Sequence, residues 1–453
     1  MAIKARYAFS REQKMFGANH FCQTLQPMVR DKNLTGTNPT EPRDVWFSTS
    51  MDSNEMNGLA NNRTSPCMLP LVIRVALILS MVASGIAAEP PSLTTSGDGT
   101  LQLRGKRFRG IGVNYYDAFV RSLSSTPARS IDPAFHALAT NGIPFARFAA
   151  CGYWPVDWAL YQTNRSEYFT RLASVVNIAE KHRIGLIPSL FWHQATISDL
   201  VDEPLDQWGN PSSLTIDFMR RYTREVVTRF KDSPAIWAWE FGNEFNLPAD
   251  LPNAAQHRPP VHPSLGTASS RSKRDELTHD MIRIALTEFA KEVRRHDPQR
   301  LILSGNAFPR PTAWHQKHEK RWGRDSAPQW REMLLADNPS PIESLSGRLY
   351  STNDLASLPW AVDATRTAKK PLFIGEFGVP GALTAESLAQ FRQWLEAIET
   401  HQVPLAALWV YDFDGQSADW NVSSDNSRAP LLRLIAERNA AWRAAKSDAS
   451  GSK

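Results

Sequence analysis

The chain has 453 residues, of which 42% are hydrophobic and 21% are charged. This length and composition exclude a single small module and a disordered chain, and leave one large domain or two ordinary ones. Three cysteines, Cys22, Cys67 and Cys151, are too few for a disulfide framework or a four-cysteine zinc site. The 51 Lys and Arg residues against 46 Asp and Glu give a formal charge of +5, which suggests a nucleic-acid or membrane-surface partner.

The first 88 residues differ in character from the rest. Met1–Cys67 lacks any apolar period and is rich in Asn, Thr, Pro and Ser, so residues 1–67 are predicted to be a disordered extension or to precede the true start at Met68. Residues 68–88 have the layout of a secretory signal peptide, with Arg74, an apolar run over Val75–Ala83 and small residues at the end. The alternative, a membrane anchor over Leu69–Ala88, is interrupted by Arg74 and has less than the ~20 apolar residues of a span. A secreted or periplasmic protein is expected.

Removal of the signal peptide changes the charge balance. Residues 1–88 contain nine basic and six acidic residues, so the remaining chain has 42 basic and 40 acidic residues. A nearly neutral protein gives little support for a polyanion partner. We therefore expect no nucleic-acid partner, no membrane span after cleavage, no cofactor and a monomer.

From Arg109 onward, eight short apolar runs alternate with amphipathic segments. The runs are FRGIGVNYY, IPFARFAA, IGLIPSLFW, AIWAWEFGNE, RLILSGN, IESLSGRLY, PLFIGEFG and PLAALWVYDF. Helices are expected at Ser212–Lys231 and at Glu276–Arg295, the second with an inward stripe of Ile284, Phe289 and Val293. Eight strands that alternate with helices, without a glycine-rich nucleotide turn, predict an α/β fold, a (β/α)8 TIM barrel over residues 89–453.

Reactive residues in such barrels sit at the carboxyl ends of the strands. The predicted strand ends are polar and aromatic. They carry Asn114, Tyr115, Arg147, Trp192, His193, Asn243, Glu244, Asn306, Tyr350, Glu376, Trp409 and Tyr411.

Two of these residues, Glu244 and Glu376, end strands that are otherwise apolar, where a carboxylate without a partner is costly. The fourth and seventh strands face each other across the barrel mouth, which would place two carboxyl groups on either side of a sugar. Retaining glycosidases need such a pair about 5–5.5 Å apart, one protonated and one ionised. The alternative is that each glutamate pairs with an arginine as structural support, but two such residues with polar neighbours favour catalysis.

The sequences Trp239-Glu240-Phe241-Gly242-Asn243-Glu244 and Ile374-Gly375-Glu376-Phe377-Gly378 resemble the Asn-Glu and Glu motifs of glycoside hydrolase family 5. This is the cellulase and mannanase family of the retaining clan A, and the resemblance covers about residues 97 to 445. It implies that Glu244 is the acid/base and Glu376 the nucleophile.

The resemblance also implies a substrate-binding set. Arg147 corresponds to the arginine that holds the nucleophile ionised, His193 to the histidine of the third strand and Trp409 to the tryptophan under the sugar. Asn243 is expected to bind the sugar 2-hydroxyl, and Tyr350 to contact the nucleophile. Asn114 and Trp192 are added to this set from their places at predicted strand ends, and not from the resemblance.

One position departs from the family pattern. Arg348 stands two residues before Tyr350, where the family usually has a histidine. An arginine cannot accept a hydrogen bond or pass a proton near neutral pH. It would either lower the pKa of a nearby carboxylate or block part of the cleft, and the sequence leaves both open.

Two long loops, Leu247–Asp275 and Ala307–Trp330, are expected to select the substrate. One or two of the loop tryptophans are predicted to line the cleft, because an indole face suits the C–H face of a pyranose. The candidates are Trp154, Trp208, Trp314, Trp322 and Trp330. His315 and His318 have the spacing of metal ligands without a partner motif, so we expect solvated side chains and no metal site.

The leading hypothesis is a secreted retaining glycoside hydrolase that cleaves a β-linked polysaccharide or oligosaccharide, of the endo-β-mannanase or endo-β-glucanase type. The first alternative is a carbohydrate-binding barrel that lost turnover through Arg348. The second is a basic surface-binding protein, which rests on the charge alone.

Overall fold

The computed structural model describes residues 92–123 and 129–451. The described residues belong to one compact unit, which runs from Ala88 to Lys453. The predicted extension and signal peptide, residues 1–88, lie outside the described residues, so their boundaries stay predictions. No helix among the described residues is long and apolar enough to cross a membrane.

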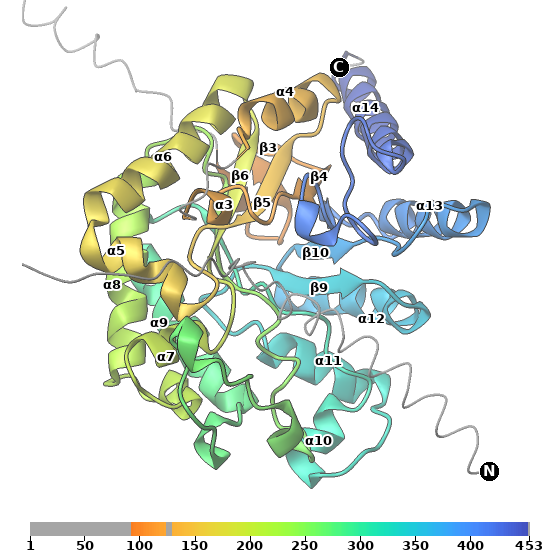
Figure 1. Cartoon of the computed structure of the whole chain (residues 1–453). Coiled ribbons are helices and arrows are strands. Elements are labelled where there is room, and N and C mark those ends of the chain that lie inside the picture. The colour runs from red at the N-terminus through yellow and green to blue at the C-terminus, as the bar shows by residue number, and fades with distance from the viewer. Residues whose placement is uncertain (1–91, 124–128, 452–453) are drawn as a thin grey trace, which may run out of the picture. The chain divides into compact units, whose positions relative to one another are not determined.

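Eight parallel strands form a nearly closed barrel, as predicted, with helices around the outside (Figure 1). Each of the eight predicted runs contains one strand. The strands are β4 (Gly110–Asn114), β5 (Phe145–Ala149), β6 (Gly185–Phe191), β7 (Ala238–Gly242), β8 (Leu301–Leu303), β9 (Leu345–Leu349), β10 (Leu372–Phe377) and β11 (Leu405–Leu408). Their order is β8-β7-β6-β5-β4-β11-β10-β9. β8 and β9 stand at the two ends of this order, and there the Glu343 N–H donates to the Ile302 carbonyl at 3.0 Å.

Every residue of these eight strands is buried, which explains their nearly continuous apolar sequences. The strands contain four charged residues, Arg147, Glu240, Arg348 and Glu376. These four form one connected set of ion pairs, because Arg147 contacts Glu240 and Glu376, and Arg348 contacts Glu376. Buried charges joined in one such set indicate a functional site in the barrel.

Twelve α-helices lie in the described part of the chain. They are α3 (Val120–Leu123), α4 (Asp132–Thr140), α5 (Ala159–Thr163), α6 (Arg165–His182), α7 (Thr196–Leu200), α8 (Leu214–Phe230), α9 (His279–His296), α10 (Ala313–Glu319), α11 (Ala327–Ala336), α12 (Thr352–Ala368), α13 (Ala385–Thr400) and α14 (Ala429–Gly451).

The two helices predicted in detail are present as α8 and α9. Both begin at a hydroxyl cap, since Ser213 accepts from the Ile216 N–H and Thr278 from the Met281 N–H. The predicted inward stripe of α9 was wrong at Ile284, which is 36% exposed. The helical period from Phe289 leads instead to Ala285, which is buried.

A small antiparallel sheet covers the amino end of the barrel. Its strands are β1 (Leu93–Thr95), β2 (Leu101–Leu103) and β3 (Lys106–Arg107). The Leu93 N–H donates to the Trp237 carbonyl at 2.8 Å, and Leu93 and Leu101 pack with Phe145 in the core at this end. The carboxyl ends of the strands are left for the site.

A glycine is required at position 305, two residues after the end of β8, because two strand ends approach each other closely there. Its φ is +73°, and an added Cβ would lie 1.9 Å from the Gly242 carbonyl oxygen. We expect Gly305→Ala to lower the free energy of unfolding by about 3 kcal/mol or more, from overpacking and backbone strain together. The matched control is Gly381→Ala, with φ +74° but no atom within 4 Å of the new Cβ, for which about 1 kcal/mol is expected. Urea unfolding of both variants tests this, and equal losses would contradict it.

Candidate active site

Glu376 lies within β10 at the barrel mouth and is 4% exposed. One oxygen, Oε1, accepts from Arg147 Nη1 at 3.0 Å and lies 3.3 Å from Arg348 Nε. The other, Oε2, accepts from the Tyr350 hydroxyl at 2.8 Å. Fixed donors therefore surround both oxygens, an environment that suits a carboxylate.

Glu244 follows β7 by two residues and takes a left-handed backbone conformation with φ of 54°. Its N–H donates to the Gly305 carbonyl at 3.0 Å, so the end of β8 holds this strained turn. Burial, and then the negative charge of Glu376, raise the pKa of Glu244 to about 7, while Arg348 acts in the opposite direction. Glu244 is thus protonated in weakly acidic solution while Glu376 sits among cations.

Arg147 links most of the polar residues of the site. Its side chain is fully buried, and Nε pairs with Glu240 at 2.6 Å. Nη1 donates to Asn114 Oδ1 at 2.9 Å and to Glu376, and Nη2 donates to Asn243 Oδ1 at 2.9 Å. These contacts fix the guanidinium beside Glu376.

The two asparagines differ in position. Asn114 is fully buried, and its Nδ2 donates to the Gly375 and Leu408 carbonyls at 2.9 and 3.2 Å. Both ends of the Asn114 amide are thus engaged by protein groups, which makes it a support for Arg147, and its contact with a substrate stays a prediction.

Asn243 lies nearer the opening and is only partly buried. Its Oδ1 accepts from Arg147 Nη2 at 2.9 Å and from Arg348 Nη2 at 2.8 Å. Because a guanidinium can only donate, the oxygen must face the two arginines and the Nδ2 must face away. The amide is thus oriented to donate to a bound molecule.

An aromatic wall stands beside the carboxylates. Trp192 and Trp409 are stacked with ring centroids 6.0 Å apart and an interplanar angle of 26°. Trp192 also covers the Arg147 guanidinium at 4.5 Å, and Tyr116 packs against both indoles. Gln416 Oε1 accepts from Trp409 Nε1 at 2.8 Å, which fixes that ring.

His193 packs between Tyr153 and Trp154, with ring centroids 5.2 and 5.5 Å away. Burial, and then the charge of Arg271, lower the pKa of His193 to about 4, so the imidazole is neutral over the physiological range. Within the described residues its Nε2 has no hydrogen-bond partner. His262 of the first long loop packs on Trp154 at 5.8 Å, which brings this loop to the His193 side of the site.

Three of the strand-end residues do not join the site. The Tyr115 hydroxyl bonds to Asp412, the Tyr411 hydroxyl donates to the Ala134 carbonyl at 3.0 Å, and Asn306 Nδ2 donates to the Asp337 carbonyl at 2.9 Å. These side chains bond to residues outside the cluster around Glu244 and Glu376.

The loop tryptophans fall into different classes. Trp208 and Trp330 are fully buried and donate to backbone carbonyls, so they pack their own loops. Trp322 is 54% exposed, and Trp154 alone lies against a predicted site residue, His193. The prediction for His315 was wrong, because this side chain is buried and its Nδ1 lies 2.6 Å from Asp325 Oδ1.

Sequence reasoning missed three residues. Glu240 pairs with Arg147 beneath the site, Tyr116 joins the aromatic wall, and Trp420 packs edge-on against Tyr350 at 5.3 Å. Glu240 could have been found, since it is a charge inside a buried strand and lies two and four residues before Gly242 and Glu244. Trp420 sits in a loop with no comparable period.

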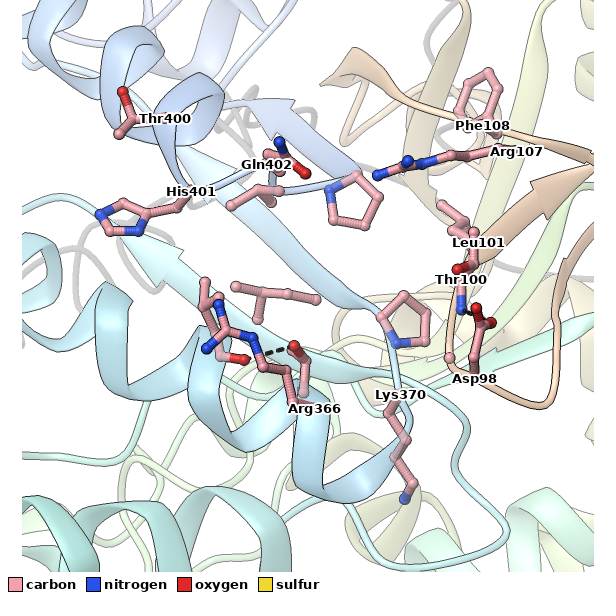
Figure 2. A pocket seen from close by; sticks show the side chains of 17 residues that line it. Asp98, Thr100, Leu101, Arg107, Phe108, Arg366, Lys370, Thr400, His401 and Gln402 are labelled. Atoms are coloured by element: carbon pink, nitrogen blue, oxygen red, sulfur yellow. Dashed lines mark hydrogen bonds between the residues drawn. The ribbon is translucent and has the colours of Figure 1, made fainter.

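A cavity of about 540 Å³ lies at the other end of the barrel (Figure 2). Its lining includes Phe108, Pro371 and Val403, which precede β4, β10 and β11. Two of its cations are engaged elsewhere, because Lys370 Nζ donates to the Asn338 carbonyl and Arg366 pairs with Asp363. Its lining contains a single acidic residue, Asp98, so the paired carboxylates mark the better candidate site. The described residues contain no group of three or more possible metal ligands.

No family model matches the chain. A probable mannan endo-1,4-beta-mannosidase C from Aspergillus terreus is 29% identical over 86 residues, which are 19% of this chain and 18% of the relative. The match thus spans less than a fifth of that protein's length.

Solved structures match over a longer range. The endo-1,4-beta-mannanase from Rhizomucor miehei is 19% identical with a TM-score of 0.56, over 77% of this chain and 99% of that one. A glycoside hydrolase family 5 mannosidase from Rhizomucor miehei is 11% identical with a TM-score of 0.52, over 78% and 98%. The second of these neighbours is named as a member of the family that the sequence motifs resemble, and the chain has the (β/α)8 barrel fold.

Proposed function

We propose that the chain is a secreted retaining glycoside hydrolase that cleaves a β-linked polysaccharide or oligosaccharide of the mannan or glucan type. The observation that carries the proposal is the pair Glu244 and Glu376, whose Oε1 atoms lie 3.6 and 3.3 Å from the same nitrogen, Arg348 Nε. The two Oε1 atoms therefore lie no more than about 6.9 Å apart, a limit that admits the separation of about 5–5.5 Å in retaining enzymes and excludes most of the range of about 6.5–9.5 Å in inverting ones.

In the proposed first step, the Glu376 carboxylate attacks the anomeric carbon and forms an ester. The bond to the leaving sugar breaks, and Glu244 gives its proton to the departing oxygen. In the second step, Glu244 takes a proton from water, which attacks the same carbon and releases Glu376. Two inversions give overall retention.

The electrostatics support both roles of Glu244. Its pKa is raised in part by the charge of Glu376, and that charge disappears when the ester forms. The pKa of Glu244 should then fall, which turns the acid of the first step into the base of the second. Asn243 would donate to the sugar 2-hydroxyl, and the aromatic wall of Trp192 and Trp409 would pack against the pyranose.

The proposed substrate preference is mannan before glucan, with endo action. Its support is that the neighbours named above, and the short match to the Aspergillus protein, are a mannanase and mannosidases by name. The alternative is a barrel that binds carbohydrate without turnover. It rests on Arg348, whose Nε lies next to the carboxylates of both Glu244 and Glu376.

Purified residues 89–453 should release reducing sugar from mannan, and proton NMR of the first product should reveal a β-anomer before mutarotation. No hydrolysis of mannan, cellulose, xylan or mixed-linkage glucan would favour the binding barrel. An α-anomer as first product would contradict retention.

The proposal includes export through the predicted signal peptide at residues 68–88 and a monomeric mature chain. Expression of the full chain should yield a protein outside the cytoplasm whose amino terminus lies near residue 89. Mass spectrometry tests the cleavage, and light scattering tests the monomeric state. An uncleaved product would contradict the first, and an oligomeric product the second.

A further inference from the structure

Arg348 occupies a place in β9 that is fully enclosed by protein. Its side chain is 4% exposed, and each of its three nitrogens faces protein acceptors. Nη1 donates to the Asn306 and Gly347 carbonyls, and Nη2 to the Gly305 carbonyl and Asn243 Oδ1. Nε faces the Oε1 atoms of Glu376 and Glu244.

The neighbouring strand makes room for this side chain. A Cβ at Gly375 of β10 would lie 2.3 Å from Arg348 Nη1, so the guanidinium uses space that any other residue at 375 would fill. The two Nη groups of Arg348 donate to protein acceptors, and its buried Nε, which has no hydrogen-bond partner among the described residues, faces the two carboxylates, so no Nη donor is left for a group on a substrate. Arg348 therefore neither blocks the cleft as a loose side chain nor binds an acidic sugar.

The buried charges of the site form a nearly balanced group. Arg147 and Arg348 supply two positive charges, and Glu240, Glu244 and Glu376 supply three carboxyl groups. One proton on Glu244 makes the group neutral, which is the state that the first chemical step needs. Without the charge of Arg348, the three carboxyl groups would need a second proton for the group to be neutral.

We propose that Arg348 is a positioning residue that limits the Glu244–Glu376 pair to one proton and turns the Asn243 amide toward the substrate. The proposal rests on the glycosidase function above and assigns a working role to the residue that replaces the usual histidine. It predicts that Arg348 sets the pH range of activity.

The direction of the effect follows from the groups that face Glu244. They are Glu376 on β10, Arg348 on β9, Arg147 on β5 and Asp354 on α12, and the two arginines lower the pKa of Glu244 while the two acids raise it. Removal of the Arg348 charge should raise the pKa of Glu244. The alkaline limb of the pH profile should therefore move to higher pH.

The test uses Arg348→Met, Arg348→Lys and the control Arg300→Met. Arg300 is equally buried and paired with Asp297 at 2.8 Å, but it precedes β8 at the amino end of the barrel. For Arg348→Met we expect the alkaline limb of kcat/KM to rise by about one pH unit or more, since an opposite charge at this distance shifts a pKa by about 1–3 units. Its kcat at pH 6 should fall at least tenfold, more than KM changes.

Arg348→Lys should keep the pH limbs within a few tenths of a unit, because the charge remains. It should still lose kcat, because one ammonium cannot bind Asn243 and three carbonyls in the same geometry. Arg300→Met should lower the thermal midpoint and leave the pH limbs unchanged. An unchanged alkaline limb in a folded Arg348→Met protein, or the same shift in both Met variants, would overturn the proposal.

A second measurement does not require turnover. Infrared titration follows the band of the protonated carboxyl group, and its loss in Glu244→Gln assigns it to Glu244. The titration midpoint should be higher in Arg348→Met than in the unmodified protein and nearly unchanged in Arg348→Lys. If the unmodified protein hydrolyses nothing but the midpoint moves as expected, the glycosidase function fails while the electrostatic role of Arg348 stands; an unmoved midpoint overturns that role.

Discussion

Glu376→Ala is expected to lower kcat on the natural substrate by about 10⁴-fold or more, the range seen when one member of a catalytic unit is removed. The change removes the carboxylate that would attack the anomeric carbon and leaves the ion pair of Arg147 with Glu240 and the contacts of Asn243 in place. Binding of an oligosaccharide should therefore survive. Reducing-sugar release and calorimetric binding measure the two effects separately.

A small external nucleophile provides the control for this variant. Azide fits the space left by the side chain and should attack an activated β-glycoside from the face that Glu376 occupied, which gives an α-glycosyl azide. Glu240→Gln, in the same barrel but not at the reacting carbon, should give no such product. Full hydrolysis by Glu376→Ala would refute the assignment of the nucleophile.

Glu244→Gln is expected to lower kcat on polysaccharide by about 10²–10⁴-fold, the usual contribution of a general acid. With an aryl glycoside whose leaving group needs no proton, the first step should remain fast and the ester should accumulate as a burst. The alkaline limb near pH 7 should also disappear, because the group with a pKa of about 7 is gone. Stopped-flow measurement of the released phenol tests both, and an unchanged alkaline limb would assign it to another group.

The same variant should change stability with a defined sign. The pKa of Glu244 is raised from 4.5 to about 7 in the folded protein. The favourable contribution of its protonated form is complete below pH 4.5 and is lost as pH rises through 7. Glu244→Gln should therefore stabilise the protein at pH 8 by about 3 kcal/mol and have little effect at pH 4. A larger gain at pH 4 would contradict the buried acid.

The barrel was predictable because its strands are buried on both faces and read as apolar runs of nearly constant spacing. The polar residues at the strand ends could also be identified from the sequence, but the directions in which their side chains point could not. Tyr115 and Tyr411 follow site residues by one or two positions and point away, where the Tyr115 hydroxyl meets Asp412. Side chains alternate along a strand, but this rule weakens where strands end, as the register shift between β10 and β11 illustrates.

The part of the site that could not be predicted depends on packing between strands that are distant in sequence. Whether Arg348 would block the cleft or act on a carboxylate was decided by the space at Gly375, on the next strand, and by the carbonyl of Gly305. Trp208 and Trp330 could not be separated from Trp154 by sequence, because their burial depends on how each loop folds back.

The most direct test of the central claim is to trap the covalent intermediate. A 2-deoxy-2-fluoro β-mannobiosyl or β-cellobiosyl fluoride should inactivate the protein and add one glycosyl group. Peptide mass spectrometry should then locate this group on Glu376, and the adduct should be released by transfer to an added sugar. An adduct on another residue, or turnover of the reagent with inversion and no adduct, would contradict the account.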